Sequence, residues 1–343
     1  MKANPLKKLT IYDIAEQAKV SPATVSLVLN GKWKSHRISE PTARLILNIS
    51  QKAEYKINRN ARSLRLNQSG LAGMIIPQYT NRFFAGLAEA FESEARARGL
   101  CPIVVSAHRD PQNEEEIINS LMAHQIEFLF IVGARSPERL RKMCQKKHIR
   151  CVNVDLPGEG PSIVTDNYRG AFNLADRMLK EPLAQRDYES NSLYFIGGLK
   201  EDYATSNRVV GFRDAMTNHG LNPSEDHIHI CGYEAEGAEF SLKSIHERLD
   251  GLPQGIFINS ITALEGIVRY LKKLPHENYA EMVIGCFDWD PFASFLSIPI
   301  LMVRQDTEKL ISEAYRMIDE YPSNRETLIM IPPVLIEPEC KMA

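Results

Sequence analysis

Apolar residues near the start of the chain recur with a helical period. Four of them are spaced i, i+3, i+4 and i+7, which places their side chains on one face of an α-helix. These residues are Ile11, Ile14, Ala15 and Ala18. Thr10 and Asp13 resemble an N-cap residue followed by an acid in the first turn. The pattern therefore predicts a short amphipathic helix that begins after Thr10.

Two more short helices are predicted before residue 53. Ser21 is a candidate N-cap with Pro22 at the first helical position, where the missing N–H costs nothing. Ser39 precedes a third helix with Pro41 in its first turn. The inward positions expected for these two helices are Val25, Val28, Leu29, Leu45, Ile46 and Ile49. Helices this short are marginal alone, so we expect the three to share one small core.

From residue 71 the pattern changes to short apolar runs that alternate with helical segments such as 82–98 and 112–124. The runs predicted as strands are 71–77, 101–106, 127–132, 150–155, 192–197, 255–259, 282–287 and 300–305. This alternation is typical of parallel sheets with helices on both faces. About 270 residues exceed the needs of one sheet, so we predict an α/β body of two lobes with a cleft between them.

Composition narrows the class of protein. A chain of 343 residues with 44% hydrophobic and 24% charged residues is ordinary for a globular protein of two or three domains. No apolar run reaches the ~18 residues of a membrane helix, and no signal segment opens the chain. We therefore expect a cytoplasmic protein without membrane association. The six cysteines include no CxxC pair, so free thiols are expected and neither a metal nor a cofactor.

Charge divides the chain into a basic head and an acidic body. Residues 1–70 carry 13 Lys and Arg against four Asp and Glu, a net charge of +9. The remaining residues carry 28 basic and 39 acidic side chains, a net charge of −11. A basic head favours a polyanion as its partner. The charge by itself is equally consistent with a Lys-rich surface that only contacts solvent.

The two helices around residue 20 are close enough to form a helix-turn-helix, whose second helix enters the DNA major groove. The exposed positions expected on that helix are Pro22, Ala23, Ser26, Leu27 and Asn30, with Thr24 near its start. A plain three-helix bundle is the alternative, and the positive charge of the head favours DNA binding.

The segment YKINRNARSLRLNQSG, residues 55–70, is basic and has few strongly apolar residues. It suits a linker, but Asn58 could also cap a short helix over 59–66. Such a helix would not be stable alone. It could form on DNA, with Leu64 wedged between base steps in the minor groove and Arg62 or Arg65 near phosphate.

Several of these segments closely resemble the DNA-binding head and hinge of the LacI/GalR family of bacterial transcriptional regulators. They are TIYDIAEQAKVSPATVSLVLNG (10–31), RIS (37–39), Thr42, Tyr55 and NRNARSLR (58–65). The long loop GKWKSHRIS is similar to that of the fructose (catabolite) and sucrose repressor branch. The resemblance implies a helix-turn-helix domain at 1–57, a hinge helix or linker at 58–69, and a two-lobed effector-binding and dimerisation domain at 70–338, similar to periplasmic binding proteins.

The same resemblance implies which residues meet DNA. Residues expected to contact phosphates and fix the helices are Thr10, Tyr12, Ser21, Thr24, Ser26 and Asn30, and Arg37 is expected to contact DNA as well. Residues expected at the hinge are Tyr55, Asn58, Ala61 and Leu64. Pro22, Ala23 and Leu27 would face base edges, where many family members have Arg or Gln. Because these three side chains cannot hydrogen-bond a base, readout should rely on thymine methyl groups and on DNA deformability.

Ligands of doubly wound sheets bind at the carboxyl ends of the strands. The candidate ends are 77–84, 109–110, Asp155, 197–200, Asn259 and Asp288. The resemblance implies two crossovers between the lobes, near residue 165 and within 290–330. Its implied effector-binding residues are Tyr79, Phe83, Asp155, Arg208, Asn259, Asp288 and Trp289. Such side chains suit vicinal hydroxyls and sugar C–H faces.

Each of these assignments has a structural alternative. Arg208 could lie on a helix surface, Asp288 could cap a loop, and Trp289 could be a packed rim residue. Tyr79 and Phe83 could belong to the core. A phosphorylated sugar is also considered, because GGLK (197–200) follows a strand and precedes a helix, so its amides and Lys200 could hold phosphate.

The sequence thus predicts a repressor of carbohydrate genes that binds a pseudo-palindromic DNA operator as a homodimer and responds to a sugar or sugar phosphate. A sugar-binding transport protein is the alternative, but it would need an export signal and no basic head. An enzyme is not expected, because neither GxSxG nor HExxH nor a paired-cysteine site occurs.

Overall fold

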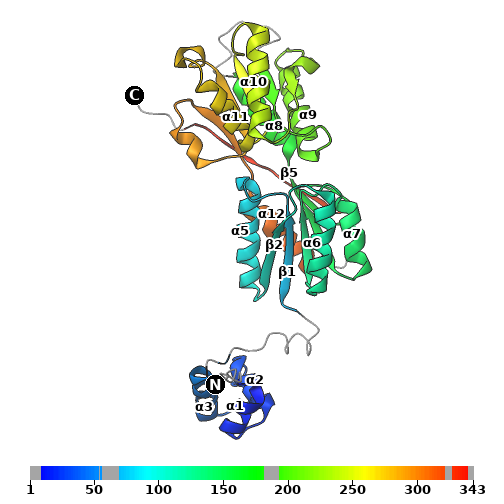
Figure 1. Ribbon diagram of the computed structural model, residues 1–343, viewed down its shortest axis with the longest axis vertical. Coiled ribbons are helices and arrows are strands. Elements are labelled where there is room, and N and C mark those ends of the chain that lie inside the picture. Colours follow the sequence, from blue (N-terminus) through cyan, green and yellow to red (C-terminus); the bar gives the residue numbers. More distant parts are fainter. Residues whose placement is uncertain (1–8, 54, 56–68, 181–192, 321–326, 339–343) are drawn as a thin grey trace, which may run out of the picture. The chain divides into compact units, whose positions relative to one another are not determined.

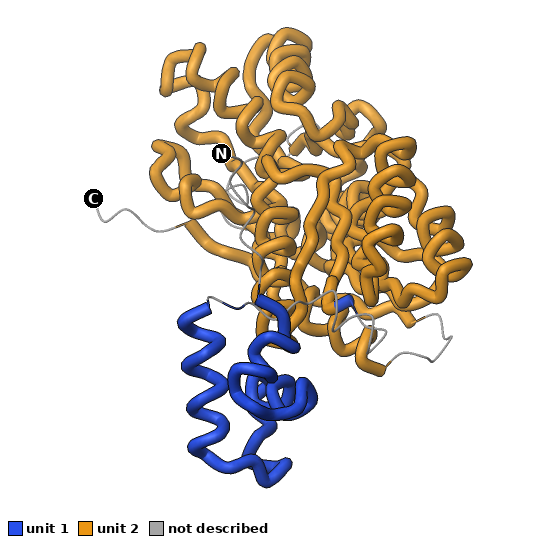
Figure 2. The backbone as a smooth tube through the Cα atoms, turned by 60° about the horizontal axis from the view of Figure 1, so that its bottom comes forward, with its two compact units in different colours: residues 1–69 blue, residues 70–343 orange. Residues whose placement is uncertain are grey.

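Two compact units divide the backbone, residues 1–69 and 70–343 (Figure 2). The computed structural model describes residues 9–53, 55, 69–180, 193–320 and 327–338. The predicted hinge residues Asn58, Ala61 and Leu64 therefore lie outside the described residues, as do Arg62 and Arg65.

The first unit contains the three predicted helices, α1 (Ile11–Ala18), α2 (Pro22–Leu29) and α3 (Glu40–Lys52). Each begins at its predicted cap, because the hydroxyls of Thr10, Ser21 and Ser39 accept a hydrogen bond from the backbone N–H three residues on. Their buried core consists of Ile14, Ala15, Ala18, Val25, Val28, Ala43 and Ile46. The prediction of three short helices around one core is confirmed.

One inward position of α3 was predicted wrongly. Leu45 is 47% exposed, whereas Ile46 is fully buried beside Ala43 and Ser50. With 3.6 residues per turn, positions 43, 46 and 50 share a face, and position 45 lies about 100° to 160° around the helix from each of them. The hydrophobicity of Leu45 suggested burial, but the helical period decides the orientation.

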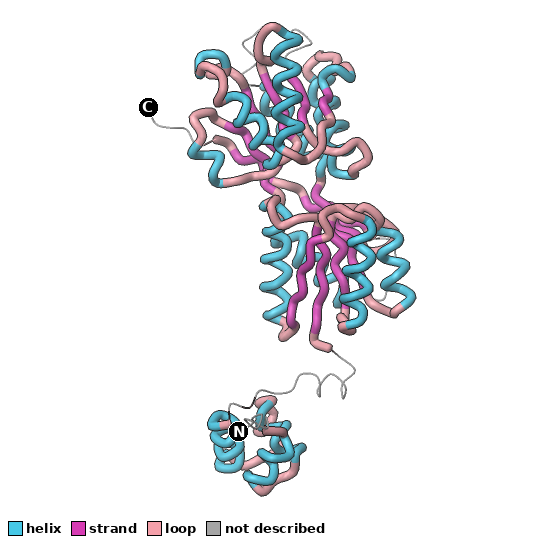
Figure 3. Tube along the Cα trace, in the orientation of Figure 1, coloured by secondary structure: helices cyan, strands magenta, loops and turns pink. Residues whose placement is uncertain are grey.

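The second unit begins with a sheet of six parallel strands in the order β11-β5-β4-β3-β1-β2 (Figures 1 and 3). The strands are β1 (Leu71–Ile76), β2 (Cys101–Ser106), β3 (Phe128–Val132), β4 (Arg150–Val154), β5 (Ser162–Thr165) and β11 (Leu328–Ile331). One face packs against α5 (Arg82–Ala97) and α12 (Thr307–Asp319). The other face packs against α6 (Pro111–Ala123) and α7 (Pro137–Lys146). We call this layered structure lobe 1.

Lobe 2 repeats the arrangement with the order β12-β10-β9-β8-β6-β7, in which β12 alone runs antiparallel to its neighbour. Its strands are β6 (Leu193–Ile196), β7 (Ile228–His229), β8 (Gly255–Ile258), β9 (Val283–Phe287), β10 (Ile300–Arg304) and β12 (Val334–Ile336). Helices α10 (Ala235–Leu249) and α11 (Ile261–Leu271) cover one face, and α8 (Asn167–Lys180) and α9 (Tyr203–Asn218) the other. Short 3₁₀ turns are η1 (Glu225–His227), η2 (His276–Asn278) and η3 (Pro291–Phe295).

The chain crosses between the lobes three times, where two crossings were predicted. It passes from β5 to α8, from β10 to α12, and from β11 to β12 (Figure 1). The third crossing was missed because Pro332 and Pro333 separate two short strands, LIMI and VLI, that lie at the edges of their sheets. All three crossings connect the lobes beside the same set of strand ends.

The described cysteines agree with the expected free thiols. Cys144, Cys151 and Cys286 are buried, Cys101 and Cys231 are half-buried, and none of these five forms a disulfide. Cys340 lies outside the described residues. Within the described ranges, each helix is too short or too polar to cross a bilayer.

Candidate functional site

Polar side chains at the ends of α2 hold this helix in shape. The Ser21 hydroxyl accepts from the Thr24 amide at 3.1 Å and lies 2.9 Å from the Thr24 hydroxyl. At the other end, Asn30 Nδ2 donates to the Ser26 carbonyl oxygen at 2.7 Å. Thr10 and Asp13 form the reciprocal capping box that starts α1. These residues therefore fix the helices, whatever they contact in a complex.

The face of α2 that was predicted to meet bases is largely apolar. Ala23 and Asn30 are exposed, whereas Pro22, Ser26 and Leu27 are half-buried. Tyr12, on α1, is 70% exposed and its hydroxyl is free to reach a partner outside the head. A helix with this surface can offer van der Waals contacts to thymine methyl groups but few hydrogen bonds to base edges.

The long loop between α2 and α3 is anchored by two apolar side chains. Trp33 and Ile38 pack against the head's core. Gly31 and Arg37 have φ angles of 71° and 54°, in the left-handed region that lets the loop turn back on itself. The exposed basic side chains left on this loop are Lys32, Lys34 and Arg37. Their charge suits contact with a phosphate backbone.

Tyr55 belongs to the head in this structure. Its side chain is half-buried against the core of the three helices, and its amide donates to the Ser50 carbonyl oxygen at 2.9 Å. The resemblance had placed it in the hinge. Its contacts here are those of a residue that closes the head's core.

In the second unit, Arg208 is a buried residue of α9 with 3% exposure, which excludes the surface alternative. Its Nε donates to Asn167 Oδ1 at 2.8 Å, and its Nη1 donates to the Asn259 carbonyl oxygen at 2.6 Å. The guanidinium carbon lies 3.6 Å from the centre of the Phe287 ring. The side chain is therefore held by the start of α8, by the residue after β8 and by the last residue of β9.

Asp288 follows β9 with a φ of 85° and is 6% exposed. One of its carboxylate oxygens accepts from Gln305 Nε2 at 2.6 Å, and Gln305 Oε1 accepts from the Thr165 hydroxyl at 2.5 Å. Burial raises the pKa of Asp288, and the nearby Arg208 opposes that rise. Gln305 thus links Asp288 to the first and second crossings between the lobes.

Asp155 directly follows β4 in lobe 1 and has a φ of 67°. Burial, and then the carboxylate of Asp202, raise its pKa to about 7, while Arg208 and Arg109 act in the opposite direction. Its Oδ1 has no hydrogen-bond partner among the described residues. Asp155 is therefore a carboxyl group that changes charge near neutral pH at the boundary between the lobes.

Further residues of this cluster were not assigned from the sequence. Asp202 Oδ2 accepts from the Tyr233 hydroxyl at 2.7 Å, and also from the Thr205 amide and hydroxyl at 3.0 and 3.1 Å. Arg109 of lobe 1 lies 4.8 Å above the Tyr233 ring of lobe 2 and 5.7 Å from the Phe84 ring. Arg109 Nε has no partner within the part of the chain that the structure describes. The strand-end rule pointed to Arg109, but no local signal pointed to Tyr233.

Phe83, Asp288 and Trp289 line one pocket between the lobes, with a volume of about 380 Å³. Its other wall includes Arg304 and Gln305 of the second crossing. Phe83 is 8% exposed and also belongs to the core of lobe 1. It therefore both lines this pocket and packs in the core, which were the two alternatives for this residue. Trp289 is 38% exposed, and Arg304 lies 5.7 Å from its ring.

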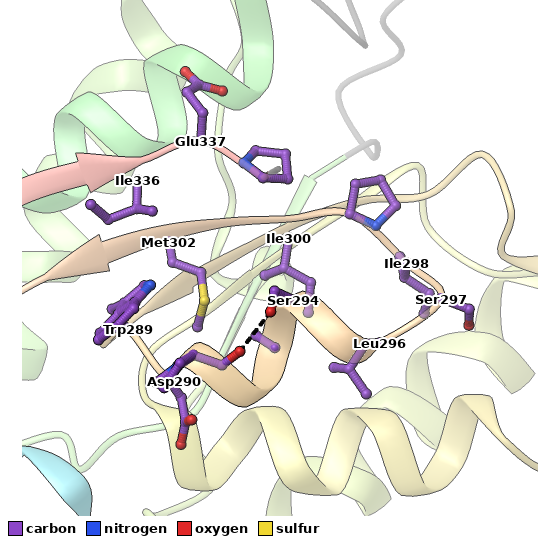
Figure 4. A pocket seen from close by; sticks show the side chains of 14 residues that line it. Trp289, Asp290, Ser294, Leu296, Ser297, Ile298, Ile300, Met302, Ile336 and Glu337 are labelled. Atoms are coloured by element: carbon purple, nitrogen blue, oxygen red, sulfur yellow. Dashed lines mark hydrogen bonds between the residues drawn. The ribbon is translucent and has the colours of Figure 1, made fainter. Parts of the chain in front are cut away.

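Trp289 also borders a second, more apolar pocket that lies wholly in lobe 2, among β10, β12 and η3. Figure 4 shows Trp289 and Asp290 at one end of this pocket and Leu296 and Ile298 at the other.

Tyr79 lies elsewhere. It is 52% exposed, its hydroxyl donates to the Val104 carbonyl oxygen at 2.8 Å, and it does not line the pocket of Phe83.

The glycine loop after β6 does not offer a phosphate cradle. The Gly197 and Gly198 amides donate to the carbonyl oxygens of His229 and Gly232, and the Leu199 amide donates to the Thr205 hydroxyl. The Lys200 side chain is exposed. These three amides are therefore already used within the protein, whereas the phosphate interpretation required them to be free.

Comparison with known families decides the class of protein. Residues 10–58 match the family described as bacterial regulatory proteins, lacI family. Residues 69–295 match the periplasmic binding proteins and sugar binding domain of LacI family. The chain belongs to the LacI family of bacterial regulatory proteins. The resemblance inferred from the head and hinge motifs is confirmed, and this LacI-family protein is a DNA-binding transcriptional regulator.

Curated relatives of this LacI-family regulator include two sugar-operon repressors. It is 43% identical over 194 residues to the ribitol operon repressor of Klebsiella aerogenes, covering 56% of this chain and 72% of that protein. It is 26% identical over 316 residues to the sucrose operon repressor of Klebsiella pneumoniae, covering 92% of each chain.

Solved structures share its fold. The lac repressor dimer bound to operator and the anti-inducer ONPF matches with a TM-score of 0.81 at 17% identity, covering 98% of this chain and 100% of that one. The Cra regulator from Pseudomonas putida in complex with fructose 1-phosphate matches with a TM-score of 0.69 at 20% identity, covering 78% and 98%. The predicted helix-turn-helix head and two-lobed α/β body are therefore confirmed.

Proposed function

We propose that this regulator represses carbohydrate genes as a homodimer on a pseudo-palindromic DNA operator, and that a sugar-like effector bound between its lobes controls it. The observation that carries this proposal is the cluster of Asp155, Asn259 and Asp288, which follow strands of both lobes, with Arg208 of α9. Strand ends at such a switch between sheets are where α/β proteins bind small ligands. The sugar-operon relatives support carbohydrate genes as the target.

For the DNA interface we propose the residues expected from the sequence. The apolar face of α2, with Pro22, Ala23 and Leu27, would contact base edges. The residues proposed to contact or orient the phosphate backbone are Thr10, Tyr12, Ser21, Thr24, Ser26, Asn30 and Arg37. One head covers one half-site, and a dimer places two heads on a two-fold operator. The exposed basic loop around Arg37 supports the phosphate contacts.

For the effector site we propose Phe83, Asp155, Arg208, Asn259, Asp288 and Trp289. Carboxylates and the guanidinium group would hold vicinal hydroxyls, and the aromatic rings would cover C–H faces. Arg109, Asp202 and Tyr233 are added to this set, because they join the same cluster through the contacts described above. A role for Tyr79 in the effector site remains a prediction from the sequence, because its hydroxyl donates to the Val104 carbonyl oxygen of β2.

Regulation would proceed by a shift between conformations. An effector that binds one arrangement of the lobes more tightly than another favours that arrangement. We propose that residues 58–69 act as a hinge between the head domain, 1–57, and the body, 70–338. A change in the arrangement of the lobes would move the two hinges of a dimer. Whether these hinges become ordered on DNA would then set the affinity for the operator.

A sugar-binding transport protein is disfavoured, because that role gives no purpose to a basic helix-turn-helix head. We propose further that the protein acts without catalysis and in the cytoplasm, where it meets DNA. The family consists of regulators, and binding alone suffices for the proposed role.

To test this proposal, the full-length protein is used to select its operator from random duplex DNA. Binding to the selected duplex is then titrated by fluorescence anisotropy. We expect a two-fold symmetric sequence, and an affinity that falls steeply with salt because phosphate contacts release counterions. Addition of the correct effector should change operator affinity at least tenfold. A selected sequence without symmetry, or affinity equal to that for random DNA, would refute the proposed repressor.

A further inference from the structure

The chain enters lobe 1 at Gly70, and residues of two neighbouring strands hold it there. Gly70 is the first residue of the second compact unit, and β1 begins at the next residue. Its carbonyl oxygen accepts from the amide of Cys101, the first residue of β2, at 2.7 Å. Its own amide donates to Oε1 of Glu127, the residue directly before β3, at 2.8 Å. The point where the head-bearing segment joins the body is therefore fixed from both sides.

Glu127 is itself held in place by the sheet. Its amide donates to the Leu71 carbonyl oxygen at 2.9 Å, so its backbone extends the pairing of β1 with β3 by one residue. Its side chain is half-buried. Among the residues that the structure describes, the Gly70 amide is the only hydrogen-bond partner of this carboxylate. Because a hydrogen bond to a charged acceptor is stronger than one between neutral groups, this contact suits an anchor.

The backbone of Gly70 departs from the extended path of β1. Its φ of 71° lies in the left-handed region, which glycine adopts without steric cost. A Cβ added here would meet no atom within 4 Å, so the direction of the chain, and not lack of space, requires glycine. The direction in which the chain leaves lobe 1 is thus set by this dihedral angle and by the two hydrogen bonds of Gly70.

Resting on the proposed function, we propose that Glu127 is a positioning residue for operator recognition. Its carboxylate holds the Gly70 amide and thereby fixes the direction in which the chain leaves lobe 1 for the DNA-binding head. Glu127 acts through Gly70 and not through contact with DNA. Without this anchor, the exit of the chain has to be ordered when the operator binds, and the lost conformational freedom weakens binding. Nonspecific binding relies on phosphate contacts and needs no such order.

Three substitutions of Glu127 separate its hydrogen bond from its charge. Glu127→Gln removes the charge but keeps an acceptor oxygen at the same reach, whereas Glu127→Asp keeps the charge on a side chain that is one methylene shorter. Glu127→Ala removes both. We expect the Ala and Asp variants of the full-length protein to bind the selected operator about tenfold more weakly, the effect of ordering roughly one further residue on binding. The Gln variant should stay within about threefold of wild type, because its amide oxygen still accepts.

Two matched controls accompany these variants. Glu115→Ala removes another half-buried glutamate of lobe 1, on α6, which pairs with Arg139 of α7, and should bind the operator as the wild type does. Gly70→Ala tests the same exit from the backbone and should weaken operator binding at least about threefold, because alanine disfavours the left-handed region. Gly220→Ala places the same strain in lobe 2, at a φ of 74° with no atom within 4 Å, and should leave operator affinity unchanged.

Fluorescence anisotropy with the selected operator and with a scrambled duplex measures specific and nonspecific affinity. Nonspecific affinity should stay within about twofold of wild type in every variant. Wild-type operator affinity in Glu127→Ala, or an equal loss on both duplexes, would overturn the positioning role and leave the proposed function intact. So would an Asp variant that binds as wild type beside a Gln variant as weak as Ala, because charge alone would then act. If the wild type selects no operator, the proposed function fails and this inference fails with it.

Discussion

The guanidinium of Arg82, on α5 of lobe 1, lies 2.6 Å from the carboxylate of Asp290, in lobe 2, and joins the lobes beside the pocket of Trp289. Asp290 is well placed for this contact, because its other oxygen accepts from the Phe292 amide at 2.8 Å and caps η3. The Arg82 side chain is 62% exposed, so the ion pair is an adjustable contact and not a buried one.

Removal of this ion pair should loosen the contact between the lobes. In Arg82→Ala we expect amide hydrogen exchange in residues 288–296 to become about two to five times faster, in line with the small free energy of an exposed pair. Mass spectrometry of peptides from this segment measures the change. Arg96→Ala is the matched control, because Arg96 pairs with Glu92 on the same helix. Equal acceleration in both variants would refute a bridge between the lobes.

The carboxyl of Asp155 predicts a pH dependence of stability. Its pKa of about 7 in the folded protein lies above the usual 3.8, so the folded state binds this proton more tightly than the unfolded state. Its contribution to stability is thus fully present below about pH 4 and is lost as pH rises to about 7. The Tm of Asp155→Asn should exceed that of wild type by a margin that grows from pH 5 to pH 7.5 and then levels off.

Thermal unfolding monitored by circular dichroism at half-unit pH steps measures that margin. Glu159→Gln provides the control for a change of charge on the same loop, and its margin should stay flat with pH. A constant margin for Asp155→Asn, or one that shrinks as pH rises, would contradict the raised pKa.

Arg208 is predicted to stabilise the body as well as to bind effector. Arg208→Met leaves Asn167 Oδ1 and the Asn259 carbonyl oxygen without their donors, which should cost about 3 kcal/mol of unfolding free energy. Urea unfolding measures it. Arg213→Met, on the same helix, removes an ion pair with the exposed Glu225 and should cost less than about 1 kcal/mol. A cost for Arg208→Met no larger than that would mean that the buried guanidinium is not needed for folding.

The prediction for Leu64 is based on the sequence. Leu64→Ala should weaken specific operator binding about tenfold or more while nonspecific DNA binding stays within about twofold, because the wedge acts on the bent operator and not on phosphates. Anisotropy titrations with the selected operator and with a scrambled duplex measure both. An equal loss of affinity for the two duplexes would refute the proposal that Leu64 wedges between base steps.

The helices of the head and most strands of the body were readable from the sequence. Caps such as Thr10, Ser21 and Ser39 act within one helical turn, so a few neighbouring residues carry the whole signal. All eight predicted strands are present, because buried parallel strands are continuous apolar runs. Strands β5, β7, β11 and β12 were not predicted, since each has only two to four residues.

The sequence by itself determined the family, the head with its caps, and the separate positions of Asp155, Arg208, Asn259 and Asp288. The tertiary structure alone decided that Leu45 is exposed, that the chain crosses between lobes three times, and that Arg109 meets Tyr233. Helix caps and apolar periods are local, so neighbouring residues reveal them. The partners of a buried charge come from segments far apart in the chain, and packing of the two sheets decides which of them meet.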